Sequence, residues 1–364
     1  MSSLLEDRYR LVLRMLPSDY RQAWEEDMVA SFMQAAYAAA PDDAEGVEIS
    51  RPSLAETASI AVLAVRVRLG GTGAAPRSFV WGEAVRRIAL IGLLAHAIGA
   101  LVGVVYLIWA FEQLGGVIPL TDGRPMFATL WEALWRLAGL LWIPAYLSAV
   151  HGHHRAARIL AVIAFLPMMV NSVMSMTGGP SGFSLTTVYG LLFGALPILA
   201  MAAFGPDSPC VSARPWLIAL PVGVVAVVAA TSAFGLAAQS EADQGELLAL
   251  TALTDKAGLW CAGLTGAAVV HLIIEHRRPR RIPVWPLALA LLVPPVLLLR
   301  VITLVHDLRL TGTTDIALTV TIGAVQCAAL VVTGAMLARI AARRLRHLPT
   351  AAEPAPGQTA PTVT

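Results

Sequence analysis

Hydrophobic residues recur along this chain in two patterns, and the change between them falls near Trp81. Before it, apolar positions repeat every three to four residues among charged ones, which is typical of amphipathic helices on a soluble core. After it, apolar runs of about twenty residues alternate with short polar segments, and about twenty helical residues cross ~30 Å of hydrocarbon. The pattern therefore predicts a soluble helical segment followed by a membrane domain.

Residues 1–69 are predicted to form a small helical domain, whose first helix spans residues 4–16 with one apolar face. That face comprises Leu5, Tyr9, Val12, Leu13 and Leu16. Pro17 ends this helix, and Ser18 is positioned to cap the second helix, over residues 19–40. Apolar residues recur every four positions along the second helix: Tyr20, Trp24, Met28 and Phe32.

Turn and cap signals divide the rest of this domain. Residues 41–50, PDDAEGVEIS, predict a polar loop. Ser53 and Glu56 then form the S-x-x-E pattern of a capping box before an apolar run, which predicts a third helix to about Leu69. Residues 70–80 begin with GGTGAAPRS and are interpreted as a flexible linker.

The membrane domain is predicted to occupy residues 81–346, and the Pro- and Thr-rich tail, residues 347–364, to be disordered. Eight apolar runs are long enough to span a bilayer: 88–111, 127–150, 158–176, 184–204, 215–238, 257–275, 284–305 and 316–338. We therefore expect an all-α polytopic membrane protein with eight transmembrane helices and a small N-terminal cytoplasmic helical domain.

The basic residues alternate from one flank to the next, which predicts the orientation of the spans. With the N-terminal domain inside, the inner flanks hold Arg66, Arg68, Arg77, Arg86, Arg87, Arg155, Arg158, Arg214, Arg277, Arg278, Arg280, Arg281, Arg339, Arg343, Arg344 and Arg346. The outer loops hold only Arg124, Lys256 and Arg309. Because cytoplasmic loops are enriched in Lys and Arg, both termini are predicted to be cytoplasmic. The preference for arginine over lysine suggests a GC-rich bacterial genome, and hence a bacterial inner membrane.

Composition agrees with this class and excludes others. The chain is 57% hydrophobic and 14% charged, whereas soluble domains carry about 25% charged residues. A net charge of +2, without a basic patch, gives no reason to expect nucleic acid binding. Cys210, Cys261 and Cys327 are far apart, so neither a disulfide framework nor a zinc site is indicated. No secretory signal peptide is expected in the first ~80 residues.

Charged residues inside the predicted spans mark the one candidate ligand site. Glu132 and Arg136 are four residues apart, which places them on one helix face in the orientation that favours attraction. Asn171 and Arg300 are predicted at similar depth in the outer half of the bilayer. Since intramembrane charges usually face a bundle interior or a wet cavity, these four residues form a hypothetical outward-facing pocket for a small anionic or zwitterionic ligand. The structural alternative, which the sequence favours, is an ion pair with a snorkelling arginine.

Other candidates have ordinary explanations that the sequence favours. The histidines at 151, 153 and 154 lie beside arginines, and a basic loop at lipid headgroups explains them better than a metal site. Pro294 and Pro295 predict a kink in the seventh span. His96 is expected to hydrogen-bond a neighbouring helix. No phosphate loop, G-x-S-x-G elbow or H-E-x-x-H helix is present, so no cofactor, metal or enzymatic activity is indicated.

Residues 9–32 contain the pattern L-P-x-x-Y-R-x-x-W-x-E-x-M. This stretch resembles the helical prefix modules of some bacterial permease-like multi-pass proteins, of the kind encoded beside PadR-type repressors. The resemblance implies a cytoplasmic docking module, and we expect a regulatory membrane protein that engages a cytosolic partner through its second helix. The residues proposed for docking are Tyr20, Trp24, Glu25, Glu26 and Asp27. The alternative is a permease that uses the outward-facing pocket.

Overall fold

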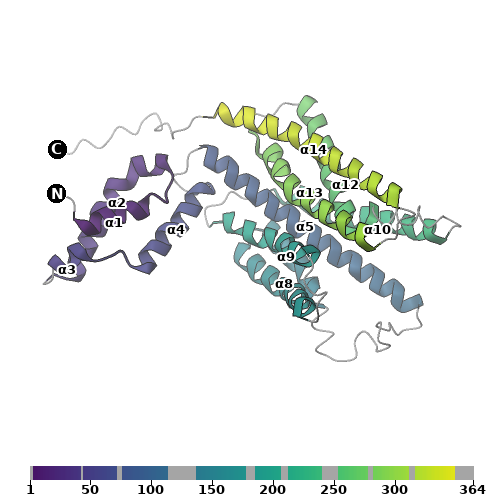
Figure 1. Ribbon diagram of the computed structural model, residues 1–364, viewed down its shortest axis with the longest axis horizontal. Helices are drawn as coiled ribbons and strands as arrows, with labels where there is room; N and C mark the ends of the chain where they lie inside the picture. Colours follow the sequence, from purple (N-terminus) through teal and green to yellow (C-terminus); the bar gives the residue numbers. More distant parts are fainter. Residues whose placement is uncertain are drawn as a thin grey trace.

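The computed structural model describes residues 3–41, 44–71, 76–113, 137–177, 185–205, 212–239, 253–277, 282–310 and 316–348, and every regular element in these ranges is helical (Figure 1). The elements are α1 (Leu4–Leu13), α2 (Ser18–Ala39), α3 (Ala44–Ile49), α4 (Leu54–Arg68), α5 (Pro76–Gln113), η1 (Ala138–Leu141), α7 (Trp142–Val150), α8 (His154–Thr177), α9 (Leu185–Ala200), η2 (Met201–Ala203), α10 (Ala213–Gln239), α12 (Lys256–Arg277), α13 (Val284–Leu310) and α14 (Ile316–Arg346). The predicted all-α class is confirmed for the described part of the chain.

Helices α1 to α4, which we call the prefix domain, pack around a hydrophobic core of their own. This core is separate from that of the later helices and comprises Tyr9, Leu13, Leu16, Val29, Ile60 and Ala64. The Tyr9 ring stacks on Phe32, with ring centroids 3.9 Å apart. The predicted apolar face of the first helix is confirmed, since Leu5, Tyr9 and Leu13 are all buried.

The ends of the prefix helices test the cap predictions. Ser53 caps α4 as predicted, because its Oγ accepts a hydrogen bond from the Glu56 N–H at 3.0 Å. The prediction for Ser18 is wrong: Pro17 occupies the N-cap position of α2, and Ser18 is already its first residue. The loop predicted over residues 41–50 contains the short helix α3.

The junction between α4 and α5 is tightly packed where it is described. Helix α5 begins at Pro76, so residues 76–80 of the predicted linker are helical. A Cβ added to Gly82 of α5 would lie 1.8 Å from the Leu69 carbonyl oxygen at the end of α4. Gly70 adopts φ 79°, a conformation that glycine takes at no steric cost. These two glycines let the end of α4 rest directly on the first turns of α5.

Seven helices in the described residues are long and apolar enough to cross a membrane. They are Pro76–Gln113, His154–Met174, Leu185–Ala203, Ala213–Ala233, Lys256–Arg277, Val284–His306 and Ala317–Arg346. Large apolar side chains point outward on several of them, such as Val225 at 68% exposure and Leu199 at 72%, a surface suited to lipid. The chain is therefore a multi-pass membrane protein.

The second of the eight predicted spans, residues 127–150, is described only from residue 137 onward. Its described part forms the shorter apolar helix Ala138–Val150. The structure thus supports seven of the eight predicted spans by length, and the described part of this span is too short to be counted.

The membrane helices, which we call the body, are arranged around α5 (Figure 1). Helix α5 packs against α7, α9, α10 and α13, while α12, α13 and α14 contact one another on one side of it. Helices α7, α8 and α9 follow one another on another side. Their contacts use small residues, including Ala145, Ala149 and Ala161, all at most 2% exposed, which lets membrane helices approach closely.

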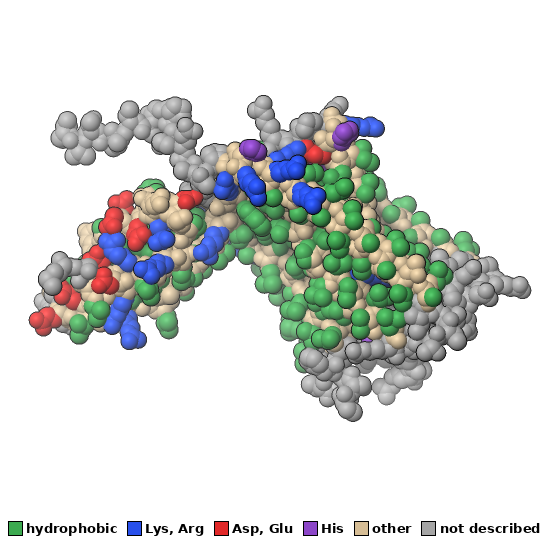
Figure 2. Space-filling view, turned by 45° about the horizontal axis from the view of Figure 1, so that its top comes forward, with side chains coloured by type: hydrophobic (Ala, Val, Ile, Leu, Met, Phe, Trp, Pro, Cys, Tyr) green, Lys and Arg blue, Asp and Glu red, His purple; other side chains and the backbone are tan. Residues whose placement is uncertain are grey.

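Arginine side chains gather at one end of the body, which we call the arginine end (Figure 2). Arg77 at the start of α5 donates to the Arg346 carbonyl at the end of α14, at 3.5 Å. Arg158 at the start of α8 donates to the Met201 carbonyl at the end of α9, at 2.7 Å. Arg344 of α14 forms an ion pair with Glu275, near the end of α12. Helices α5 and α8 therefore begin at this end, and α9, α12 and α14 finish there.

Candidate functional site

The structure describes two of the four residues of the predicted polar pocket. Glu132 and Arg136 lie outside the described residues. Asn171 is exposed on α8, whereas Arg300 of α13 is fully buried. Helix α9 packs against both α8 and α13. Asn171 and Arg300 lie on different helices, and with Glu132 and Arg136 outside the described residues the four-residue pocket stays a prediction.

Arg300 forms an ion pair with a residue that the sequence analysis did not select. Its Nη1 lies 3.2 Å from Asp255 Oδ2, and the Arg300 side chain is 0% exposed against 30% for Asp255. Asp255 Oδ1 also accepts the Gly258 N–H at 2.5 Å, so this carboxylate caps α12. An aspartate directly before an apolar helix is an N-cap signal, and that signal could have identified Asp255.

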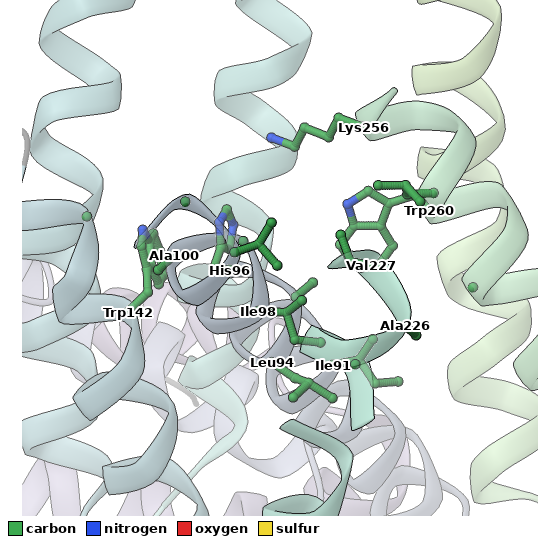
Figure 3. A pocket seen from close by; sticks show the side chains of 18 of the residues that line it. Ile91, Leu94, His96, Ile98, Ala100, Trp142, Ala226, Val227, Lys256 and Trp260 are labelled. Carbon is green, nitrogen blue, oxygen red and sulfur yellow. The ribbon is translucent and has the colours of Figure 1, made fainter. Parts of the chain in front are cut away.

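A cavity of about 1160 Å³ lies between α5, η1, α7, α10, α12 and α13 (Figure 3). Its walls are almost wholly apolar, with Ile91, Leu94 and Ile98 from α5 and Trp260 from α12. Three further tryptophans line it: Trp142, Trp216 and Trp285. Small-molecule sites usually measure about 300–1,000 Å³ and combine apolar walls with few polar groups, so this cavity has the lining of a ligand pocket and slightly exceeds the usual volume.

Glycines keep the wall of this pocket open. Gly99 and Gly103 of α5 and Gly263 of α12 line it, and a Cβ added to any of them would meet no atom within 4 Å. Larger residues at these positions would project into the cavity. The pocket therefore exists because particular wall positions carry no side chain.

The pocket contains few polar groups, and most of them are already engaged. His96 stacks on Trp142, with ring centroids 4.1 Å apart. The Thr231 hydroxyl donates to the Val227 carbonyl at 2.7 Å and is also contacted by the Tyr106 hydroxyl. Lys256, the only lysine of the chain, extends over the pocket from the first turn of α12 (Figure 3). No carboxylate of the described residues lies within ion-pair distance of its ammonium.

The histidine-rich segment forms the tight connection between α7 and α8. Gly152 turns the chain with φ 84°, and a nitrogen of the His151 ring lies 2.7 Å from the Leu147 carbonyl. His154 packs on Phe204, with ring centroids 4.4 Å apart. Among the described residues, no group of three His, Cys, Asp or Glu side chains is arranged to hold a metal ion.

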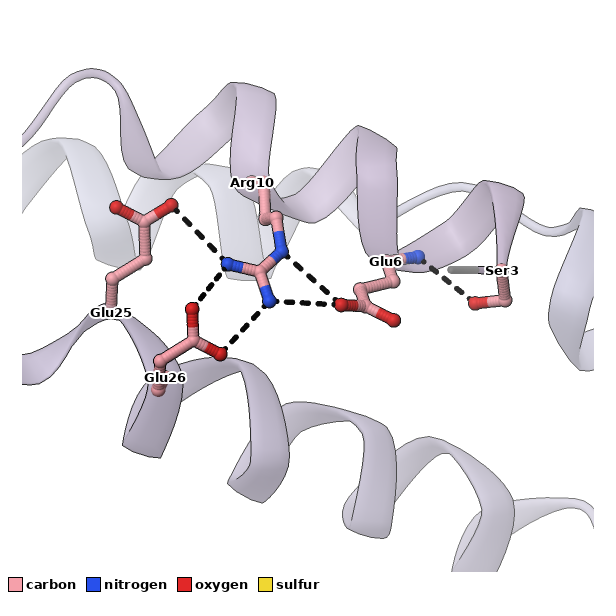
Figure 4. Close-up of polar contacts among 5 residues, drawn as sticks. All are labelled: Ser3, Glu6, Arg10, Glu25 and Glu26. Atoms are coloured by element: carbon pink, nitrogen blue, oxygen red, sulfur yellow. Dashed lines mark hydrogen bonds and ion pairs between the residues drawn. The ribbon is translucent and has the colours of Figure 1, made fainter. Parts of the chain in front are cut away.

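The residues proposed for partner docking lie along the first half of α2. Tyr20 is partly buried against the prefix core, and Trp24 is 50% exposed. Arg10 of α1 engages the acidic run: its Nη1 lies 2.7 Å from Glu26 and 3.7 Å from Glu25 (Figure 4). The hydrogen bond from Arg10 lowers the pKa of the Glu26 carboxyl. Glu25 and Glu26 thus already pair with Arg10 inside the prefix domain, whereas Asp27 is exposed.

Comparison with family models, with curated proteins and with solved structures finds no match for this chain. Support for a function of this protein therefore comes from the geometry of the sites described above.

Proposed function

We propose that this membrane protein binds a long-chain anionic amphiphile in the cavity beneath Lys256. The observation that carries the proposal is a large apolar pocket with the Lys256 cation at its rim, which pairs with no carboxylate of the described residues. Hydrocarbon would fill the tryptophan-lined interior, and a carboxylate or phosphate head would meet the ammonium. This ligand class differs from the small anionic or zwitterionic ligand expected from the sequence for the outward-facing pocket, because the described cavity is apolar.

The depth of the pocket matches an acyl chain in one leaflet. Along α12 the lining extends from Lys256 to Ala267, a rise of about 16 Å at ~1.5 Å per residue. This is about half of the ~30 Å hydrocarbon core. Lys256 lies at the end of the body opposite the arginine end, since α12 finishes beside Arg344. We assign this opposite end to the outer leaflet, because arginines mark the cytoplasmic side.

Quenching of the pocket tryptophans tests the proposal in the full-length protein. We expect dibromostearate to quench their fluorescence in nonionic detergent, and oleate to displace it more effectively than oleyl alcohol. The two competitors share a hydrocarbon chain and differ in charge. The gap between their affinities therefore measures the contribution of Lys256, roughly five-fold for one basic group. Octanoate should compete far more weakly, because each buried methylene contributes ~0.8 kcal/mol.

Matched variants separate the head site from the pocket. Lys256→Gln should close the gap between oleate and oleyl alcohol, and Lys256→Arg should keep it. Gly263→Leu should weaken quenching by narrowing the cavity, whereas Gly266→Leu, on the same helix but outside the lining, should not. An unchanged oleate preference in Lys256→Gln, or equal binding by both glycine variants, would overturn the proposal.

A second candidate function, independent of the pocket, is docking of a cytosolic protein on the prefix domain. The observation that favours it is the half-exposed Trp24 beside the exposed carboxylate of Asp27, a combination suited to a partner with an apolar and basic surface. A photo-crosslinker at Trp24 should capture one defined protein in cells, and the same group at exposed Gln34 of α2 should not. Asp27→Asn should weaken the capture. Equal capture from both positions would argue against this surface.

A further inference from the structure

A second cavity, of about 510 Å³, lies between the prefix domain and the arginine end of the body. One wall is α4, with Ala61, Val62, Val65 and Arg66. The opposite wall includes Arg86 of α5, Arg158 of α8 and the chain that follows α9. Among the described residues, the lining thus contains three guanidinium groups and no acidic side chain.

The two arginines of the body are held in fixed positions. Arg158 donates from Nη2 to the carbonyls of Met201 and Phe204, at 2.7 and 2.5 Å. Arg86, with its side chain 3% exposed, forms an ion pair with Glu83 at 3.0 Å and donates to the Ala203 carbonyl at 3.4 Å. These contacts orient the guanidinium groups before any ligand binds, which reduces the ordering cost of binding.

The cavity is amphipathic as well as basic. Val62 and Val65 of α4 are 68% and 48% exposed, and both line it. Leu54, eight residues before Val62 on the same helix, is 89% exposed. This apolar face has no covering in the described prefix domain. At Val62 and Val65 this face lies next to the arginine end of the body. The pattern of spans places that end at one surface of the membrane.

We propose that this cavity binds the phosphate of an anionic phospholipid from the arginine-side leaflet, with Arg66, Arg86 and Arg158 around the phosphate. Arginine binds phosphate through parallel charge-assisted hydrogen bonds, and basic pockets at the cytoplasmic side of membrane helices suit anionic headgroups. The first carbons of the lipid lie against Val62 and Val65. Because its walls come from both the prefix domain and the body, the bound lipid links the position of α4 to the composition of the membrane.

Hydrogen exchange of α4 in the full-length protein tests this link. In nanodiscs, replacing part of the phosphatidylcholine with phosphatidylglycerol should slow exchange over residues 54–68. Arg66→Gln should reduce the lipid-dependent change roughly five-fold, as expected for one basic group at the membrane surface. Arg68→Gln, on the same helix but outside the lining, should leave the change intact. Arg158→Gln and its control Arg155→Gln repeat the comparison on α8.

The remaining arms identify the source of the phosphate and separate this site from the amphiphile pocket. Inorganic phosphate added to phosphatidylcholine nanodiscs should not protect α4, and full protection by it would overturn the lipid assignment. Equal lipid responses in Arg66→Gln and Arg68→Gln would overturn the site. Lys256→Gln should retain the response, because that residue lies at the opposite end of the body, so failure of either proposal leaves the other testable.

Discussion

Arg300 has its whole side chain buried, and its ion-pair partner Asp255 is partly exposed and also caps α12. Removing the arginine therefore leaves an aspartate that retains its cap and reaches solvent. Removing the charge of Asp255 leaves a buried guanidinium unpaired. We expect Asp255→Asn to destabilise the protein by about 2–3 kcal/mol, and Arg300→Leu by less.

Denaturant unfolding of the detergent-solubilised protein measures this asymmetry. The double variant Arg300→Leu with Asp255→Asn serves as the control, because it removes both charges and keeps an oxygen at the cap. It should be more stable than Asp255→Asn alone. A larger loss for Arg300→Leu than for Asp255→Asn would show that the guanidinium has another important role.

Tyr9 gives the prefix domain a defined dependence on alkaline pH. Burial, together with the nearby Glu56 carboxylate, raises the pKa of Tyr9 to about 12, from an ordinary value of about 10. A raised pKa means that the folded state holds the proton more tightly. The stabilisation of the folded prefix domain by protonated Tyr9 is therefore complete below about pH 10 and is lost as the pH rises toward 12.

Limited proteolysis by an alkaline protease measures this effect. Cleavage within residues 4–69 should increase between pH 10 and pH 12 in the wild-type protein. Tyr9→Phe should show a smaller increase after correction for the protease's own pH profile. The same increase in both proteins would contradict the role of Tyr9.

At the scale of the helices, Gly82 determines how closely α4 approaches α5. A methyl group at this position would meet the Leu69 carbonyl oxygen, which belongs to the backbone and has no rotamer to change. We expect Gly82→Ala to shift α4 and to cost about 1–3 kcal/mol. Gly99→Ala on the same helix meets no atom within 4 Å and should be neutral or mildly stabilising.

The measurement is hydrogen exchange over α4 and the first turns of α5. Exchange should accelerate in Gly82→Ala and remain unchanged in Gly99→Ala. Unchanged exchange in both variants would mean that the close contact does not hold the junction together.

The helices were largely predictable from the sequence, because hydrophobic periodicity and length are local properties. The capping box at Ser53 and the apolar face around Tyr9 were found in this way. The amphiphile pocket could not be predicted from the sequence. Ile91 and Gly263 look like ordinary membrane-helix residues, and only the placement of α5 and α12 against α13 makes them face a common cavity. In a sequence, charged residues inside the spans indicate ligand sites, whereas this cavity is marked by missing side chains.

At the scale of the whole molecule, the direction of the described helices bears on the number of membrane crossings. Helices α5 and α8 both begin at the arginine end, so the chain between them must return to it. Helix α7 supplies the last part of this return, since it ends next to the start of α8. Eight crossings with both termini on the arginine side therefore stay our prediction, which this geometry favours, and the excess of arginine predicts that this side faces the cytoplasm.

Single cysteines in a background that lacks Cys210, Cys261 and Cys327 test this arrangement in intact cells. Gln22→Cys, His153→Cys and His347→Cys should react with a membrane-impermeant maleimide only after the cells are permeabilised. Gln113→Cys and Leu253→Cys, at the opposite end of the body, should react without permeabilisation. The comparison between positions 22 and 347 is decisive, because an odd number of crossings would place them on opposite sides. Labelling of His347→Cys but not Gln22→Cys in intact cells would therefore contradict eight crossings, and reversed labelling at all five positions would invert the leaflets assigned to the two proposed sites.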